Sequence, residues 1–205
     1  MSRRCLIISG GDFTPVPDPQ PDDFIIACDK GYSYCERLGL KPDLMISDFD
    51  SFSGPVSENV PVLDFPSEKD DTDTMLAIRW AYENRFDEIC LYCALGGRLD
   101  HTIANMQSLV FARKHGMRAG IYSTDEIILA LMDEKISLPR REGWSLSVFA
   151  VDTACSGVTL HGTKYLLENA VLTPAFPLGI SNQWAAPEAE ISVRDGVLLI
   201  IQSKM

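Results

Sequence analysis

LMISDFDS, residues 44–51, is an apolar run that ends in two aspartates one residue apart. Its first four residues lack polar alternation, which is typical of a strand covered on both faces of a sheet. In an extended chain, Asp48 and Asp50 project to the same side and lie close together. Neighbouring carboxylates repel each other unless a cation offsets their charge. The stretch therefore predicts a buried strand with a cation site at its end.

Similar apolar runs alternate with helical patterns through the first part of the chain. Strands are expected over residues 3–8, 24–28, 44–47, 61–65 and 88–95, and helices over residues 33–39, 72–85 and 100–116. In the last helix, Ile103, Met106, Gln107 and Val110 predict a largely apolar stripe, and His115-Gly116 supplies a stop signal. This alternation predicts a mostly parallel α/β/α domain.

The pattern changes after residues 117–123. Short strand-like pieces follow, separated by Gly, Pro, Asn and Asp, with no long helical period between them. This pattern of short strands and turns is typical of a β-sandwich or a small barrel. We therefore expect two domains, over residues 1–123 and 124–205.

Composition limits the possible partners and the cellular location. Lys and Arg total 18 against 29 Asp and Glu, giving a net charge of -11. Such a balance argues against a broad nucleic-acid or anionic-membrane surface. No apolar run approaches the roughly 18 to 20 residues of a membrane span, and the expected location is cytoplasmic. The six cysteines include a Cys90-x-x-Cys93 spacing on an expected strand, which favours buried, reduced thiols over a metal or redox site.

Polar residues follow three of the expected strands. Asp29 follows residues 24–28, Asp48 and Asp50 follow residues 44–47, and Gly96-Gly97-Arg98-Leu99-Asp100-His101 follows residues 88–95. A fourth acidic segment, EKDDTD (68–73), opens a helix. In open α/β sheets the ligand crevice lies at the carboxyl ends of the strands, so these segments are expected to converge. Magnesium suits clustered carboxylates combined with substrate phosphates.

Each acidic segment also has a simpler explanation. Asp70, Asp71 and Asp73 are able to cap a helix, and Asp100 is able to cap another. Asp29 is able to bond the turn at Gly31. The coincidence of acidic residues after three strands, with Arg98 in the same set, nevertheless favours polyphosphate chemistry.

Familiar alternatives to this chemistry lack their motifs. Neither a P-loop nor a G-x-S-x-G elbow occurs, and Ser9-Gly10-Gly11-Asp12 is a weak candidate for a phosphate cradle. The histidines at 101, 115 and 161 are expected to be structural. The cation of this site is therefore expected to be Mg²⁺, bridging phosphate oxygens while Arg98 or Lys69 contacts the transferred group.

Several motifs, taken in order, resemble bacterial thiamine pyrophosphokinase. They are ACDKG (27–31), SDFDS (47–51), EKDDTD (68–73), GGRLDH (96–101), GVTLHGTKYLLENAVL (157–172) and GISN (179–182). The resemblance implies transfer of a diphosphate from ATP to thiamine, giving thiamine diphosphate and AMP, with Mg²⁺ as cofactor. It also implies an N-terminal α/β domain, a C-terminal β-sandwich and a homodimer with active sites shared between the subunits.

The resemblance also implies roles for individual residues. Magnesium would be held by Asp48, Asp50 and Asp73, with Asp29 and Asp100 beside the polyphosphate. Arg98 would grip phosphate, while Ser51, Lys69 and Thr72 would line the substrate cleft. From the second subunit, Ser181 and Asn182 would contact thiamine, and Trp184 would cover its cationic aromatic ring. The alternative for Trp184 is a place in the domain core.

Two positions depart from the family pattern, and two other functions remain open. Ser47 stands where the family usually has Gly, and Asp29-Lys30-Gly31 stands where it has Asp-Gly-Gly. A haloacid-dehalogenase-like phosphatase would use Asp48 as a nucleophile and water as the acceptor. A dimeric metabolite-binding protein would retain the fold without turnover.

Overall fold

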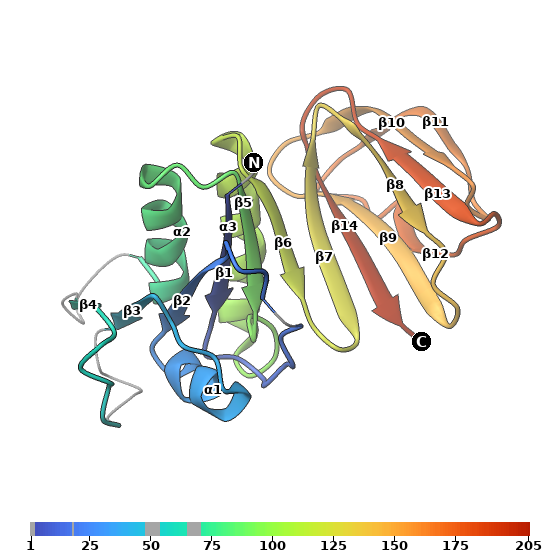
Figure 1. Cartoon of the computed structure of the whole chain (residues 1–205). Helices are drawn as coiled ribbons and strands as arrows, with labels where there is room; N and C mark the ends of the chain where they lie inside the picture. The colour runs from blue at the N-terminus through green and yellow to red at the C-terminus, as the bar shows by residue number, and fades with distance from the viewer. Residues whose placement is uncertain (1–2, 18, 48–53, 65–70) are drawn as a thin grey trace. The chain divides into compact units, whose positions relative to one another are not determined.

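The computed structural model describes residues 3–17, 19–47, 54–64 and 71–205. The chain forms two compact units (Figure 1). Unit 1 contains the chain up to Ser108 together with His115–Thr124, and unit 2 contains Leu109–Lys114 together with Asp125–Met205. Asp48, Asp50, Ser51 and Lys69 lie outside the described residues.

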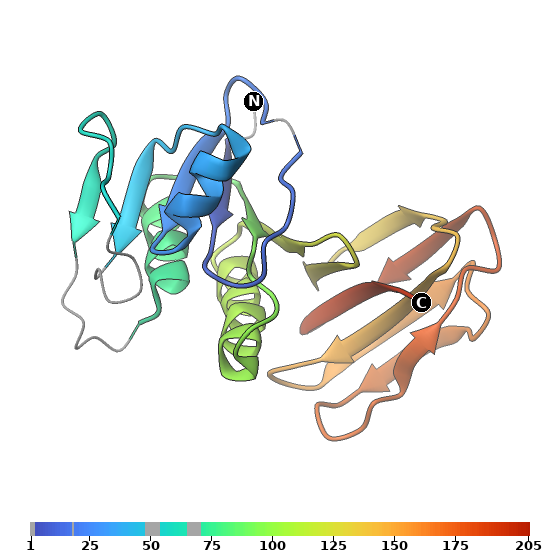
Figure 2. The ribbon, with the colours of Figure 1, turned by 90° about the horizontal axis from the view of Figure 1, so that it is seen from below.

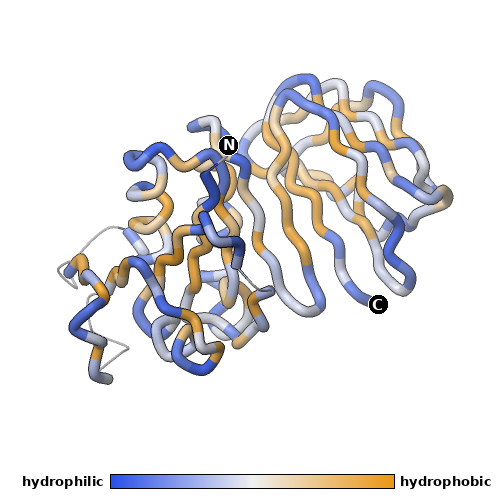
Figure 3. Tube along the Cα trace, viewed as in Figure 1, coloured by the Kyte–Doolittle hydropathy of each residue, from blue (hydrophilic) through white to orange (hydrophobic). Residues whose placement is uncertain are grey.

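Unit 1 is built on a parallel sheet. Its strands, in spatial order, are β6 (Arg118–Tyr122), β5 (Glu88–Tyr92), β1 (Arg4–Ile8), β2 (Phe24–Cys28), β3 (Leu44–Ser47) and β4 (Val62–Asp64). Every neighbouring pair among them is parallel. Four consecutive residues are buried in each of β1, β2, β3 and β5. Apolar residues accordingly concentrate along these strands (Figure 3), as expected for a sheet covered on both faces.

Among the described residues, three helices cover this sheet, and two of them have an identifiable boundary signal. They are α1 (Gly31–Leu38), α2 (Asp73–Glu83) and α3 (Leu99–Lys114). Helix α1 lies on one face of the sheet, and α2 and the start of α3 lie on the other (Figure 2). Gly39 ends α1 in the left-handed conformation at φ 68°. Thr72 caps α2 by accepting a hydrogen bond from the Met75 amide.

The apolar stripe predicted for α3 matches its buried side only in part. Val110 of that stripe is buried, but Ile103 is 50% exposed, whereas Asn105, Ser108 and Leu109 are buried. The cause is local: the Asn105 side chain donates a hydrogen bond to the Ala94 carbonyl, and Ser108 donates to the Ala104 carbonyl within the helix. Polar groups that are satisfied in this way can occupy the buried side, so apolar spacing alone misplaced it.

Unit 2 is a sandwich of two antiparallel sheets, which confirms the predicted fold class. One sheet has the order β12 (Gly179–Asn182), β9 (Trp144–Ala150), β14 (Val197–Lys204) and β7 (Glu126–Met132). The other has the order β11 (Leu167–Leu172), β10 (Cys155–His161), β13 (Glu188–Ser192) and β8 (Lys135–Pro139). A single apolar cluster includes Leu131 and Leu198 from the first sheet and Leu138 and Ile191 from the second.

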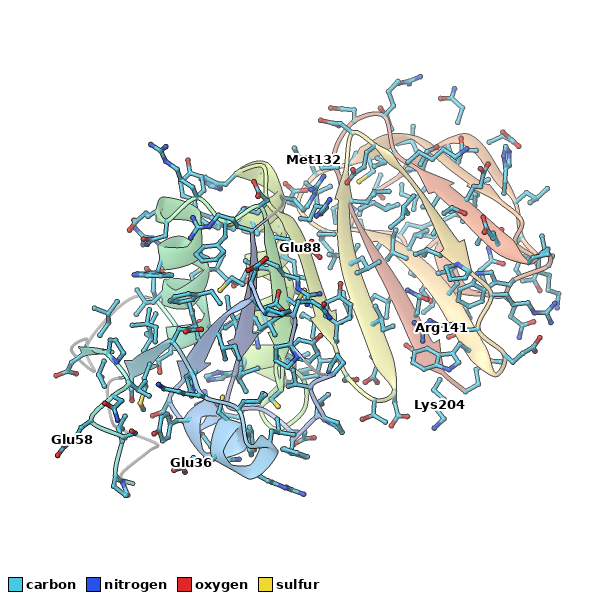
Figure 4. The ribbon with its side chains drawn as sticks, in the orientation of Figure 1. Glu36, Glu58, Glu88, Met132, Arg141 and Lys204 are labelled. Carbon is cyan, nitrogen blue, oxygen red and sulfur yellow. The ribbon has the colours of Figure 1, made fainter. Side chains whose placement is uncertain are left out.

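Charged side chains lie around the surface of each unit. Glu36 and Glu58 are exposed in unit 1 (Figure 4). In unit 2, the Arg141 guanidinium lies 5.1 Å from the centroid of the Trp144 ring.

All six cysteines are buried and free, as predicted. Among the described residues, no helix has both the length and the apolar character needed to cross a membrane.

Candidate active site

The carboxyl ends of β1, β2 and β5 border a cavity of about 500 Å³ in unit 1. Its lining comes from the segments after these strands, from the start of α2 and from α3. The lining residues are Ser9, Gly10, Gly11, Asp12, Cys28, Asp29, Lys30, Asp71, Thr72, Asp73, Thr74, Ala94, Gly96, Gly97, Arg98, His101 and Asn105. The cavity therefore gathers polar groups from segments far apart in the sequence, as the strand ends predict.

The segment after β1 forms a tight glycine turn against the segment after β5. The Gly11 amide donates to the Cys93 carbonyl at 2.7 Å, and the Asp12 amide donates to the Leu95 carbonyl at 2.8 Å. A Cβ atom on Gly11 would lie only 2.4 Å from the Leu95 oxygen. The close approach of two backbones therefore requires glycine at this position. The Tyr34 hydroxyl of α1 donates to the Gly11 carbonyl at 2.8 Å and holds the turn from the other side.

Asp29 is fixed at the end of β2. Its side chain is largely buried, and its backbone adopts the left-handed conformation at φ 46°. Its amide donates to the Ile46 carbonyl, and its carboxylate Oδ1 accepts a hydrogen bond from the Ser47 hydroxyl at 3.0 Å. Ser47 is fully buried at the end of β3. The Ser47 hydroxyl thus supplies a donor that orients the neighbouring carboxylate.

Gly31 allows α1 to begin directly against the end of β1. A Cβ atom at this position would lie 2.0 Å from the Ile8 carbonyl oxygen. The glycine in Asp29-Lys30-Gly31 is therefore needed for packing, even though the preceding position carries a lysine.

At the start of α2, the residue that caps the helix through its side chain is a threonine and not one of the neighbouring aspartates. The helix is capped by Thr72, while Asp71 forms an ion pair with Arg79 at 2.6 Å. Asp73 lies in the first turn of α2 and lines the cavity. The Thr74 hydroxyl lies 2.9 Å from that of Ser9, which joins the helix start to the turn after β1. Among the described residues of this segment, the side-chain cap comes from threonine, so the cavity position of Asp73 is not explained by capping.

Arg98 and Asp100 form an exposed, two-point ion pair. Arg98 donates through Nη2 to Asp100 Oδ2 at 2.6 Å and through Nε to Oδ1 at 3.2 Å. Arg98 lowers the pKa of Asp100, and the hydrogen bond to Asp100 raises the pKa of Arg98. Arg98 lines the cavity, whereas Asp100 stands beside it as the partner of Arg98. Because both side chains are accessible, an anion in the cavity is able to compete for the guanidinium.

The predicted metal ligands are divided between described and undescribed parts of the chain. Asp73 is the described member of the set, while Asp48 and Asp50 lie outside the described residues. Within the described part, no three His, Cys, Asp or Glu side chains lie close enough together to hold a metal ion. The cavity does offer the carboxylates of Asp12, Asp29 and Asp73, a donor type that suits magnesium.

The three residues expected to bind thiamine lie in unit 2 and differ in exposure. Ser181 is exposed in β12, in the left-handed conformation, and its amide donates to the Ser147 hydroxyl at 3.0 Å. Asn182 is buried, and its side chain accepts from the Tyr165 and Gln183 amides and donates to the Tyr165 carbonyl. Asn182 therefore anchors the chain at Tyr165.

Trp184 is a core residue, which corrects its expected place over the thiamine ring. Its side chain is 7% exposed and belongs to the apolar cluster of the sandwich. Its indole N–H donates to the Leu138 carbonyl at 3.1 Å. With both its ring and its donor used inside unit 2, Trp184 fits the core alternative that the sequence left open.

Sequence reasoning did not assign several residues of the cavity to the site. Asp12, Asp71, His101 and Asn105 all line it. Asp12 follows the glycine pair after β1, and its position next to that weak phosphate motif was the available signal. A Cβ atom on Gly96 would lie 2.0 Å from Asp12 Oδ2, so Gly96 makes room for this carboxylate. His101 lies in the first turn of α3, and Asn105 lies four residues later on the same helix face, a spacing that identifies them once the cavity is known.

Fold and cavity together define the class of protein. A parallel α/β unit gathers carboxylates and cations at its strand ends, and an antiparallel sandwich follows it in sequence. A family model described as the catalytic domain of thiamin pyrophosphokinase matches residues 20–121. A second, described as the vitamin B1 binding domain of thiamin pyrophosphokinase, matches residues 133–198. The chain belongs to the thiamin pyrophosphokinase family, and it is an enzyme of the diphosphotransferase class.

Individual relatives agree over the whole length of the chain. Thiamine pyrophosphokinase of Bacillus subtilis is 28% identical over 207 residues, covering 96% of this chain and 97% of the relative. The crystal structure of the Bacillus subtilis thiamine pyrophosphokinase has a TM-score of 0.89 at 26% identity and covers 99% of this chain and 100% of that one. A thiamin pyrophosphokinase family protein from Enterococcus faecalis has a TM-score of 0.83 at 28% identity and covers both chains completely.

The bond between Ser47 and Asp29 predicts a measurable loss of stability. Ser47→Ala removes the donor from a largely buried carboxylate, so we expect the free energy of unfolding to fall by about 1 to 3 kcal/mol. Denaturant unfolding followed by circular dichroism measures the change. Ser33→Ala is the matched control, because the Ser33 hydroxyl bonds only to the nearby Lys30 carbonyl at the surface. Equal stability of Ser47→Ala and the unmodified protein would refute the bond's role.

Proposed function

We propose that the chain transfers the diphosphate of ATP to thiamine, giving thiamine diphosphate and AMP, with Mg²⁺ as cofactor. The observation that carries the proposal is the cavity of unit 1, where Asp29, Asp73 and Arg98 come together from three separate segments. Diphosphate transfer needs groups that position phosphates and offset their charge. Carboxylates for a metal and a guanidinium for phosphate oxygens meet that need.

In this transfer, one bond to the β-phosphorus of ATP forms and another breaks. The thiamine hydroxyl oxygen forms a bond to the β-phosphorus of ATP, with loss of the hydroxyl proton. The bond from that phosphorus to the α,β-bridging oxygen breaks, and AMP leaves with the bridging oxygen. Arg98 is assigned to the phosphate oxygens, and its exposed pairing with Asp100 holds it at the cavity until the substrate binds.

Asp48, Asp50 and Asp73 are the residues assigned to magnesium. The ion, when bound, supplies positive charge to the phosphate oxygens and keeps the carboxylates ionised. Asp29 and Asp100 are assigned places beside the polyphosphate, while Ser51, Lys69 and Thr72 are assigned to the substrate cleft. These assignments are supported by the cavity of unit 1, because Asp29, Thr72, Asp73 and Arg98 all line it.

Thiamine recognition and dimerisation are assigned to residues 124–205, and catalysis to residues 1–123. The two family matches fall on either side of this boundary, which supports the division. Ser181 is the exposed candidate for contact with thiamine, and Asn182 supports it by anchoring the chain at Tyr165. Trp184 is left out of the thiamine site because it lies in the core.

A second copy of this chain is the proposed partner, with active sites shared between the subunits. Six large apolar side chains between residues 165 and 180 are 47 to 65% exposed. They are Tyr165, Leu166, Val171, Phe176, Leu178 and Ile180. Such a concentration of exposed apolar groups is typical of an interaction surface.

The six buried, free cysteines favour a reducing compartment, and we assign the protein to the cytoplasm.

The purified protein supplied with ATP, Mg²⁺ and thiamine is expected to form AMP and thiamine diphosphate in equal amounts. Chromatographic quantification of both products measures the ratio. ADP or inorganic phosphate in place of AMP would contradict diphosphate transfer, and inorganic phosphate alone would favour the phosphatase. Binding of thiamine without turnover would favour the metabolite-binding protein.

Asp73→Asn in the same assay is expected to lower kcat by at least about 100-fold, because it removes charge needed in the transition state. Asp48→Asn and Asp50→Asn are expected to behave alike. Asp133→Asn is the matched control, since Asp133 is exposed in unit 2 and its left-handed backbone suits asparagine. Near-normal turnover of Asp73→Asn would remove this residue from the site.

Dimerisation through the apolar segment predicts a change in molecular mass on mutation. Phe176 is 65% exposed, and Phe176→Asp places a charge among groups expected to be buried against a second copy. We expect the unmodified chain to elute as a dimer and Phe176→Asp to shift toward the monomer, measured by light scattering after size exclusion. Val151→Asp is the control, because Val151 is an exposed apolar residue of unit 2 outside residues 165–180. A monomeric unmodified chain at micromolar concentration would overturn the assignment.

A further inference from the structure

Lys30 occupies a position where the family pattern has glycine, and it lines the cavity. It follows Asp29 directly and precedes the first residue of α1. Its side chain is exposed, and its Cβ atom lies 3.4 Å from the place that a Cβ atom on Gly10 would take. The lysine side chain therefore begins beside the glycine turn that follows β1.

One aromatic side chain holds both the lysine and the glycine turn. The Lys30 ammonium lies 5.2 Å from the centroid of the Tyr34 ring, and the Tyr34 hydroxyl donates to the Gly11 carbonyl. Phe13 supports Tyr34 by an edge contact, with ring centroids 5.4 Å apart. Interaction with Tyr34 and, to a lesser extent, with the Asp12 carboxylate raises the pKa of Lys30. The positive charge is thus held at the cavity on a supported side chain.

Lys30 differs from the neighbouring arginines in the kind of partner it has. Arg98 is paired with Asp100, and Arg79 is paired with Asp71. The described partners of Lys30 are the Tyr34 side chain and, more weakly, the nearby Asp12 carboxylate, both of which raise its pKa. Unlike the two arginines, Lys30 forms no ion pair with a described carboxylate, so its ammonium is available to an added anion.

The place of Lys30 at the start of α1 adds to this argument. Lys30 is the N-cap residue, makes no capping hydrogen bond through its side chain, and is followed by a first turn without acidic residues. A cation at the positive end of a helix is unfavourable on its own, and a bound anion relieves that repulsion. The position is therefore better suited to binding an anion than to stabilising the helix.

We infer that the Lys30 ammonium binds a phosphate oxygen of the polyphosphate, adding a cation where the family pattern has glycine. The inference rests on the proposed function for the identity of the polyphosphate, which is supplied by ATP or by the diphosphate product. Lys30 acts here as a substrate-binding residue beside the Gly10-Gly11 turn.

Three substitutions at Lys30 test the inference in the full-length chain. Lys30→Met keeps an unbranched side chain and removes the charge, Lys30→Arg keeps the charge, and Lys30→Gly restores the family pattern. Isothermal titration with ATP and Mg²⁺, without thiamine, gives the dissociation constant of each variant. We expect Lys30→Met and Lys30→Gly to weaken binding about tenfold or more, and Lys30→Arg to stay within about threefold of the unmodified chain.

A matched control and further ligands identify what is bound. Lys41→Met removes the same charge from an exposed residue of unit 1 outside the cavity lining, and it is expected to leave ATP affinity unchanged. Parallel titrations with AMP and with thiamine diphosphate show whether the contact belongs to the nucleotide phosphate or to the transferred diphosphate. In steady-state assays, Lys30→Met is expected to raise the KM for ATP and to leave the KM for thiamine near its original value.

Failure of the inference and failure of the proposed function give different results. Unchanged affinities of Lys30→Met for ATP and thiamine diphosphate, in a chain whose unmodified form makes thiamine diphosphate, would overturn the role of Lys30 alone. Weakened ATP binding by Lys30→Met, in a chain whose unmodified form shows no turnover, would support the role of Lys30 and overturn the transfer reaction.

Discussion

Parallel pairing of the strands in unit 1 is the constraint on which its site depends. Because β1, β2, β3 and β5 run in the same direction, their carboxyl ends meet at one edge of the sheet. The backbone bonds from Gly11 and Asp12 to the segment after β5 continue this arrangement beyond the last strand residues. Asp29 is set between β1 and β3, where the Ser47 hydroxyl orients it. Residues separated by up to about a hundred positions thereby share one cavity.

Several carboxylates line the cavity, and some of them have a partner of their own. Asp71 is offset by Arg79, and Asp29 accepts a hydrogen bond from Ser47. Arg98 remains exposed beside Asp100, and Lys30 remains over Tyr34, so two cations stand at the cavity in positions open to a ligand. Some polar groups of the cavity therefore hold the site together, while others are suited to binding a divalent ion or phosphate oxygens. The departures at Ser47 and Lys30 both fall within this arrangement.

Most strands were predictable from sequence because their burial is continuous. Residues 24–28 and 44–47 form strands with the predicted bounds. Apolar spacing located the buried side of α3 only in part: Val110 is buried, but Asn105 and Ser108 are buried as well, with their hydrogen bonds satisfied. The motif GISN (179–182) was recognised, and Trp184 lies two residues beyond it, but a linear motif does not distinguish a side chain that contacts a ligand from one that supports the fold. Bonds across the sandwich, from Asn182 to Tyr165 and from Trp184 to Leu138, make that distinction.

The proposed function requires carboxylates from separate segments to hold one divalent ion together with the polyphosphate. Electron paramagnetic resonance with Mn²⁺, as a probe for Mg²⁺, measures this most directly when the full-length chain is saturated with a nonhydrolysable ATP analogue. We expect one protein-dependent Mn²⁺ site, in excess of binding to the free nucleotide, that is lost or strongly weakened in Asp73→Asn. An identical Mn²⁺ spectrum and affinity in the unmodified chain and in Asp73→Asn would contradict it.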